Sequence, residues 1–349
     1  MISRTNNFDF LRLIFASFVV ITHSYPLSGS TDSELLAKLT LGQVSFSYLG
    51  VKGFFIISGF LIFKSLQRCE NLQDYYWKRF LRLFPALFVV LLLTVLLAPI
   101  VYESTVPYWK NGSVYSYLPR NIKLYFLQYN IDGVFEKNPY PGAINGSLWT
   151  IAFEFSMYIM VSALFFIRTK KAVKVVVPLL FVFSYISAVF FPDFLNDSVF
   201  SKIGLDTHSL YDLMCYFTGG MLLTYLNTTK KIENILILSS LVILTGSLYL
   251  NIFTYVGFFT LPILVILIGK KSTMYINKVG DYLGDTSYGI YIYAFPIQQT
   301  LMYFFKLEPV PLMIYTLLLV FPMGYLSWHL IEKKALRYKD LISKRRVIQ

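Results

Sequence analysis

Ten long apolar segments dominate this chain of 349 residues, and their lengths suit helices that cross a lipid bilayer. Hydrophobic residues make up 56% of the sequence, and charged residues only 14%. This composition predicts an all-α, polytopic membrane bundle and excludes a soluble domain with a single anchor. The predicted spans are 8–27, 45–64, 83–101, 147–167, 174–191, 210–226, 234–250, 252–269, 284–304 and 311–331.

The ten spans predict one transmembrane domain over residues 1–349, because no internal repeat, low-complexity tract or soluble segment divides them. Asp212 interrupts the span 210–226 and Pro296 interrupts 284–304, so these two spans are the weakest. The first span resembles a signal peptide. It is too long for one, and no small-residue cleavage site follows it, so we expect it to remain uncleaved.

Positive charge alternates between the loops on the two sides of the membrane. With a cytoplasmic N-terminus, the inner side holds 23 of the 31 Lys and Arg residues and the outer side holds eight. Membrane proteins concentrate these residues in cytoplasmic loops, so both termini are expected in the cytoplasm. The same rule explains the net charge of +12, and no nucleic-acid partner is expected. The longest outer loop, 102–146, has the length of a lid or a binding loop.

Arg12 and His23 lie in the first span, where ionisable side chains are expensive and mark functional sites. Eleven positions separate them, so both project from nearly the same helix face, roughly 16 Å apart. They are too distant to touch one reacting atom, but they can line one channel. His23 exchanges protons near neutral pH and is a candidate general base. The alternative is a histidine that is hydrogen-bonded within the bundle.

Two other clusters bear on anion binding. Asp9 precedes Arg12 by three positions, which predicts either an intrahelical ion pair or a carboxylate that aims the arginine at an anion. Arg79 and Arg82 share a helix face, and two guanidinium groups there suit phosphates. For this second pair alone, topogenic positive charge is the simpler interpretation.

The segment 50–60 combines three glycines with Ser58, which predicts either close backbone approach or a broken helix. Lys52 lies near the outer end of this span and is expected to extend its ammonium group to the interface. Glu154 lies inside another span and needs a partner, for which His23 or an arginine is the candidate.

The remaining residues of this kind have simpler interpretations. His329 and Glu332 are expected to form a local surface pair at the end of the last span, and His208 is expected in an outer loop. Cys69 and Cys215 have no metal-type spacing, so no metal site is predicted. The chain also contains no P-loop, so nucleotide hydrolysis has no support.

Six motifs, in their order and spacing, resemble those of the acyltransferase family 3 membrane proteins. They are NFDFLR followed by His23, FFIISGFLI, KRFLRLFP, GSLWTIAFEF, SYGIYIYAFPI and HLIEKKAL. The resemblance extends from Asn7 to about Leu336 and implies ten core helices. Some members of the family carry an added periplasmic hydrolase-like domain, which is not expected here.

The resemblance implies transfer of an acyl group, usually acetyl from acetyl-CoA, to a hydroxyl of an extracytoplasmic glycan or lipid-linked sugar. O-antigen and exopolysaccharide are examples of such acceptors. It also implies that His23 is the acid/base residue and that Arg12, Arg79 and Arg82 bind the donor. One position departs from the pattern, since Ala294 stands where relatives often have a histidine before Phe-Pro.

The candidate site therefore has three groups of residues. They are the catalytic candidates His23, Asp9 and Glu154, the donor-binding candidates Arg12, Arg79 and Arg82, and the candidate pocket residues Lys52, Ser58, Trp149 and Tyr288. Acetyl-CoA is expected as a substrate, with no permanently bound cofactor, in a bacterial inner membrane. The rival interpretation is a polysaccharide transporter, a flippase or an O-antigen polymerase-like protein, because ten spans with buried charges suit those proteins as well.

Overall fold

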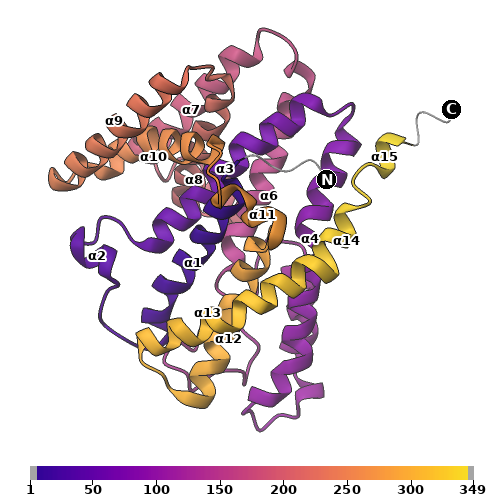
Figure 1. Cartoon of the computed structure of the whole chain (residues 1–349). Helices are drawn as coiled ribbons and strands as arrows, with labels where there is room; N and C mark the ends of the chain where they lie inside the picture. Colours follow the sequence, from indigo (N-terminus) through magenta and orange to yellow (C-terminus); the bar gives the residue numbers. More distant parts are fainter. Residues whose placement is uncertain (1–5, 345–349) are drawn as a thin grey trace.

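The structure, a computed structural model, describes residues 6–344, and these residues are almost entirely helical (Figure 1). Helices occupy all ten predicted spans. They are α1 (Phe8–Leu27), α3 (Phe46–Arg68), α4 (Leu72–Leu97), α6 (Leu148–Ala163), α7 (Val173–Phe190), α8 (Thr207–Leu222), α9 (Lys230–Tyr249), α10 (Phe253–Lys270), α12 (Ser287–Phe305) and α13 (Pro309–Ser327). In the described part of the chain, the only β contact is an isolated bridge between Tyr102 and Val134. The predicted all-α bundle is confirmed.

Eight of the ten helices are long and apolar enough to cross a membrane. The other two, α8 and α12, are the spans that the sequence marked as weakest. The α8 helix has only 16 residues. Both helices bury most of their side chains, so protein packing surrounds them inside the bundle. The chain is therefore a multi-pass membrane protein.

Five shorter helices connect or extend the long ones. They are α2 (Leu35–Leu39), α5 (Gly112–Asn121), α11 (Val279–Tyr282), α14 (Lys333–Leu336) and α15 (Leu341–Lys344). The α5 helix lies in the longest loop, whose weak apolar periodicity did not predict it. Asn121 is fully buried there and exchanges two hydrogen bonds of 2.9 Å with the backbone of Gln128. Asn138 of the same loop donates to Gln299 of α12, so buried amides fasten this loop to the bundle.

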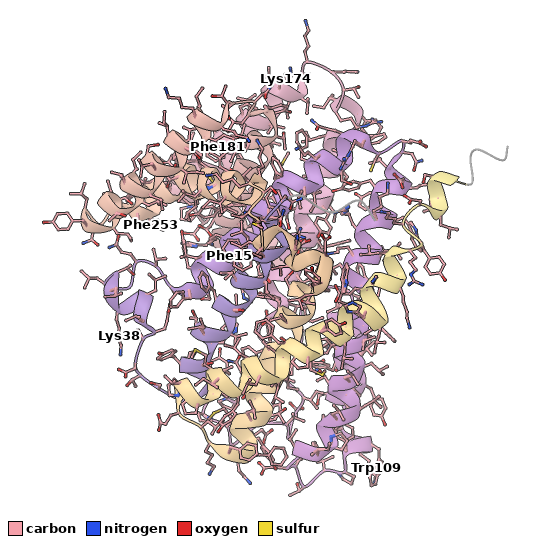
Figure 2. The ribbon with its side chains drawn as sticks, viewed as in Figure 1. Phe15, Lys38, Trp109, Lys174, Phe181 and Phe253 are labelled. Carbon is pink, nitrogen blue, oxygen red and sulfur yellow. The ribbon has the colours of Figure 1, made fainter. Side chains whose placement is uncertain are left out.

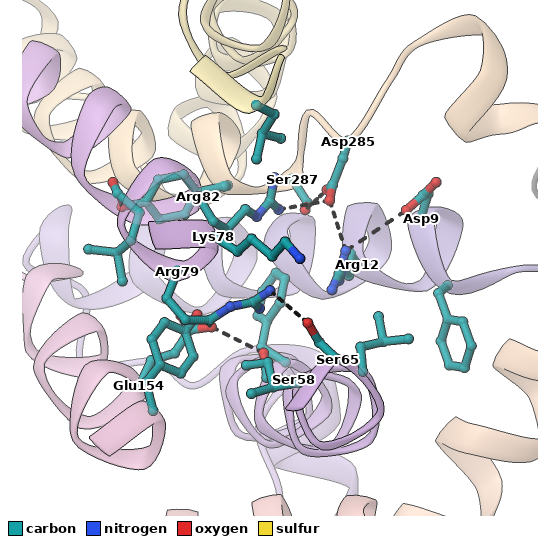
Figure 3. A pocket seen from close by; sticks show the side chains of 18 of the residues that line it. Asp9, Arg12, Ser58, Ser65, Lys78, Arg79, Arg82, Glu154, Asp285 and Ser287 are labelled. Carbon is teal, nitrogen blue, oxygen red and sulfur yellow. Dashed lines mark hydrogen bonds and ion pairs between the residues drawn. The ribbon is translucent and has the colours of Figure 1, made fainter. Parts of the chain in front are cut away.

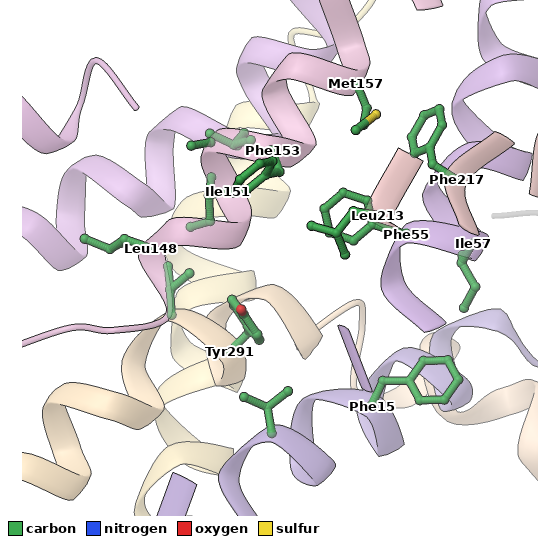
Figure 4. Close-up of a cluster of buried hydrophobic side chains, with 14 of the residues drawn as sticks. Phe15, Phe55, Ile57, Leu148, Ile151, Phe153, Met157, Leu213, Phe217 and Tyr291 are labelled. Atoms are coloured by element: carbon green, nitrogen blue, oxygen red, sulfur yellow. The ribbon is translucent and has the colours of Figure 1, made fainter. Parts of the chain in front are cut away.

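The α3 helix lies at the centre of the bundle, between α1 and α8. It runs unbroken through its glycines, so the broken-helix alternative is wrong and close approach is the correct interpretation. A Cβ atom at Gly53 would overlap the ring of Phe15, and one at Gly59 would overlap the backbone of Phe217. These small residues let the helices pack directly against one another. Figure 4 shows the buried side chains that surround this contact.

Lys52 of α3 does not extend to the interface, and that prediction is wrong. The residue is 8% exposed, and its ammonium group forms an ion pair with Asp212 of α8. The ring centroids of Tyr48 and Tyr216 lie 5.0 and 5.6 Å from the same nitrogen. The carboxylate and the aromatic faces offset the cost of burying the charge, which a span facing lipid would not provide.

We expect Lys52→Met to destabilise the protein by about 3 kcal/mol, because the substitution leaves the half-buried Asp212 carboxylate without its partner. The double variant Lys52→Met with Asp212→Leu should recover much of this loss. The check is the unfolding temperature in detergent. Lys38→Met is the matched control, because Lys38 pairs with Asp32 at the surface and contributes little. An equal effect of Lys52→Met and Lys38→Met would contradict the stabilising role of the buried pair.

Lys174 and Trp109 lie at opposite ends of the bundle (Figure 2). We call the end that carries Lys174 the inner end and the other the outer end, following the distribution of basic residues. Arg4, Arg345 and Arg346 belong to that charge count but lie outside the described residues.

Reporter fusions test this orientation. A reporter after Gln349 should be active in the cytoplasm, and one inserted within 110–140 should be active outside it. A cytoplasmic reporter within 110–140 would reverse the orientation. The comparison is restricted to fusions whose amount in the membrane equals that of the intact protein.

Candidate active site

A cavity of about 730 Å³ lies among α1, α3, α4, α6 and α12 (Figure 3). Charged side chains are scarce in this chain, yet ten of them line the cavity. The basic ones are Arg12, Arg68, Lys78, Arg79, Arg82 and Lys339, and the acidic ones are Asp9, Glu154, Asp285 and Asp340. A concave site with converging polar groups is the usual form of a substrate pocket. Charges held at membrane depth also mark functional sites.

Asp285 joins two of the arginines. Its Oδ2 accepts from Arg12 at 2.8 Å and from Arg82 at 2.7 Å, while Ser287 donates to Oδ1 at 2.7 Å. Asp9 lies 3.9 Å from the Arg12 guanidinium, so the predicted intrahelical pair is present but is longer than the contact between Arg12 and Asp285. Sequence reasoning missed Asp285. The available signal was a carboxylate at the start of the predicted span 284–304.

Glu332 is the second acidic partner of Arg82, with 3.5 Å between them. Glu332 is 1% exposed and accepts a hydrogen bond from Ser327, so the predicted surface pair with His329 is wrong. His329 instead places its Nδ1 3.0 Å from the carbonyl oxygen of Tyr325. The buried guanidinium explains the difference, because it offers Glu332 a stronger partner than a solvated imidazole.

Arg79 lies in a different environment from Arg12 and Arg82. Its side chain donates to Ser65 at 3.4 Å and lies near the rings of Tyr75 and Tyr158, with centroids at 5.9 and 5.8 Å. Within the described part of the chain it forms no ion pair, and its buried Nε has no hydrogen-bond partner. An anion entering the cavity would therefore find this guanidinium without a competing carboxylate.

Glu154 accepts hydrogen bonds at one oxygen from Ser58, at 3.1 Å, and from Tyr158, at 2.6 Å. The prediction that His23 or an arginine supplies its direct partner is wrong, because these two hydroxyls satisfy the carboxylate instead. Tyr288 lines the same cavity and donates to a backbone carbonyl of α4 at 3.0 Å.

Two candidate pocket residues lie elsewhere. Lys52 is absent from the cavity wall because it pairs with α8. Trp149 lines a second hollow of about 310 Å³, together with Tyr129 and Asp206. Trp149 and Thr150 are adjacent in α6 but project about 100° apart, so the helix presents them to different cavities.

His23 lies toward the outer end of α1 and does not line the cavity. Its ring packs edge-on against Phe295 of α12, with centroids 5.4 Å apart. Its Nδ1 is buried and has no hydrogen-bond partner among the described residues. The α1 helix is continuous, so His23 stays roughly 16 Å beyond Arg12 along the axis. His208 lies in the first turn of α8, not in a loop as predicted, and is far along the chain from this region.

The segment that follows α1 fixes the outer surroundings of His23. Glu34 is 2% exposed, and its Oε1 accepts from the Phe46 backbone at 2.6 Å and lies 3.5 Å from the Thr22 hydroxyl. Burial raises the pKa of Glu34, and the hydrogen bond from Phe46 acts in the opposite direction. Glu34 thus fastens the residue beside His23 to the start of α3.

The fold and the site together define a multi-pass helical membrane protein with a basic, substrate-sized cavity at its inner end. The model of an acyltransferase domain family matches residues 5–331. The chain belongs to this family, acyltransferase family 3, and is an acyltransferase.

Two relatives match nearly the whole length. An O-acetyl transferase of Shigella phage Sf6 is 30% identical over 338 residues, covering 95% of this chain and 96% of the phage protein. Nodulation protein 10 of Rhizobium leguminosarum bv. viciae is 28% identical, covering 98% of this chain and 96% of the relative. No solved structure matches. Family and relatives support O-acyltransferase activity.

Proposed function

We propose that this protein transfers an acetyl group from cytosolic acetyl-CoA to a hydroxyl of an extracytoplasmic glycan or lipid-linked sugar, such as O-antigen or exopolysaccharide. The observation that carries the proposal is the arrangement of one basic cavity at the inner end and His23 beyond its outer end. The relative named O-acetyl transferase supports acetyl as the transferred group.

The inner part of the cavity suits the nucleotide end of the donor. Coenzyme A carries several phosphates, and planar guanidinium groups bind phosphate oxygens through paired hydrogen bonds. Arg79 has no carboxylate partner in the described structure and takes the first of these contacts in our proposal. Arg12 and Arg82 are held by Asp285, which positions them for a second phosphate.

The pantetheine arm of the donor is thin and long, so its thioester can approach His23 while the phosphates stay among the arginines. The acceptor enters from the outer side, where His23 is partly exposed. The hydroxyl oxygen attacks the thioester carbonyl carbon, a C–O bond forms and the C–S bond breaks. His23 takes the hydroxyl proton and then delivers it to the departing thiolate, so the histidine returns to its initial state.

Two carboxylates have supporting roles in this proposal. Asp9 orients Arg12 from 3.9 Å. Glu154 lies on the cavity wall, where its hydrogen bonds from Ser58 and Tyr158 hold the carboxyl group in position. It is therefore available to accept a hydrogen bond from the amide groups of the pantetheine arm.

Mass spectrometry of surface glycans tests the function. A deletion strain should lose an acetyl-sized mass from its glycan, and complementation with the intact gene should restore it. An unchanged acetyl content, with shortened chains or lost surface export, would contradict acyl transfer and favour a polymerase or a transporter.

A further inference from the structure

On α12 and α6, the wall of the cavity ends about one helical turn before the level of His23. On α12, Tyr291 is the last residue that lines the cavity, and Phe295, one turn further, contacts the imidazole. On α6, Thr150 is the first lining residue, and a Cβ at Gly146, one turn earlier, would lie 2.6 Å from the Phe295 ring. Four residues rise about 6 Å along a helix. A thin layer of side chains therefore lies between the cavity and the histidine, and in the proposed reaction the acyl group must pass this layer to reach the imidazole.

Three residues form this layer, which we call the acyl stop: Phe54, Thr150 and Tyr291. The hydroxyls of Tyr291 and Thr150 lie 2.6 Å apart in a buried hydrogen bond. The Phe54 ring meets the Tyr291 ring edge-on, with centroids 5.8 Å apart. Tyr291 is 7% exposed, and Figure 4 shows its ring among the buried side chains close to α6. The hydrogen bond and the packing hold the ring in one orientation.

The cavity changes character along its length. Its basic residues come from the inner parts of α1, α3 and α4 and from the segment after α13, whereas Val51, Phe55 and Ile151 surround the acyl stop. A ligand that is charged at one end and apolar at the other fits this gradient. The apolar end of such a ligand meets Tyr291.

We propose that the acyl stop determines which acyl groups this enzyme accepts and restricts it to short chains, with Tyr291 as the main specificity-determining residue. The inference rests on the proposed function, because it concerns the acyl end of the same donor. A longer chain must displace a ring that a buried hydrogen bond holds in place. Apolar pockets discriminate a single methylene by about tenfold or more, so a few methylenes against a fixed ring give strong selection.

The test compares acetyl-CoA with hexanoyl-CoA, each labelled in the acyl group. Membrane vesicles with the cytoplasmic face outward come from a deletion strain that carries each variant, and label in the glycan is counted. The intact protein should prefer acetyl. Tyr291→Ala should raise the ratio of hexanoyl to acetyl label in the glycan by at least about tenfold, because the hexanoyl group can occupy the space that the ring leaves. Tyr291→Phe, which keeps the ring, should preserve the preference for acetyl.

Tyr293→Ala is the matched control. Tyr293 lies on the same helix and is 5% exposed, but it does not line the cavity. It should destabilise α12 without changing the ratio. If Tyr291→Ala does not fold, Phe54→Ala opens the same layer and decides the question. An intact protein that transfers both groups equally, or an unchanged ratio in every folded variant that opens the layer, would overturn the inference.

The two proposals fail differently. No label in glycan from any acyl-CoA with the intact protein would refute the proposed function. Normal acetyl transfer with an unaltered ratio in the folded variants would refute the acyl stop alone.

Discussion

His23→Ala should lower the rate of acyl transfer by about 10²–10⁴-fold and leave the protein folded and inserted in the membrane. The imidazole is the proton acceptor of the proposed reaction, and its main contact is an edge-on packing against Phe295 that contributes little to stability. The other two histidines cannot replace it, because His208 lies in the first turn of α8 and His329 follows α13. Acetyl content of the glycan and unfolding temperature are the two measurements.

His208→Ala is the matched control for this experiment, since His208 is exposed and lies outside the cavity wall. The acetyl content of the glycan and the unfolding temperature of this variant should equal those obtained with the intact protein. Near-normal acetylation by a well-inserted His23→Ala variant would remove His23 from the mechanism.

Arg12→Lys should weaken binding of acetyl-CoA by about tenfold or more, since hydrogen bonds to charged groups contribute about 1.5–3 kcal/mol. A lysine keeps the charge but loses the planar group that contacts Asp285 and remains available to phosphate. Arg82→Ala should have a larger effect, because Asp285 and Glu332 both lose a partner. Equilibrium binding to the detergent-purified protein measures both variants.

Arg120→Lys provides the comparison for this series, because Arg120 is exposed in α5 and remote from the cavity wall. Its donor affinity should not change. Expression level and monodispersity must accompany each affinity, since a variant that inserts incorrectly would mimic weak binding. Unchanged affinity in both Arg12→Lys and Arg82→Ala, with activity lost, would assign these arginines a structural or proton-transfer role.

The helices were predictable because the length of each apolar run indicates a helix that crosses the membrane. Even the turn at Asn251, between α9 and α10, follows from a polar residue between two such runs, and its φ of 59° is one that asparagine tolerates. The burial of α8 and α12 inside the bundle was less predictable. Their polar residues read as interruptions in the sequence, whereas the bundle surrounds them with protein instead of lipid.

The candidate site was predictable only in part. Arg12, Arg79 and Arg82 stand out in a chain with few charges, and the fold gathers all three around one cavity. Their acidic partners were missed because the pairing is tertiary. Asp285 lies 273 positions from Arg12, and Glu332 reaches α4 from the end of α13. Lys52 and Trp149 were predicted to line the pocket but lie elsewhere. The position of a residue along a helix does not by itself tell which neighbour its side chain faces.

Transfer from one side of the membrane to the other is the central claim, and labelled acetyl-CoA supplied to one face tests it most directly. Sealed vesicles of both orientations, from the deletion strain carrying the intact gene, are given the donor outside only. The account predicts labelled glycan when the cytoplasmic face is outward and almost none in the opposite orientation. Labelling only when the donor meets the extracytoplasmic face would contradict it.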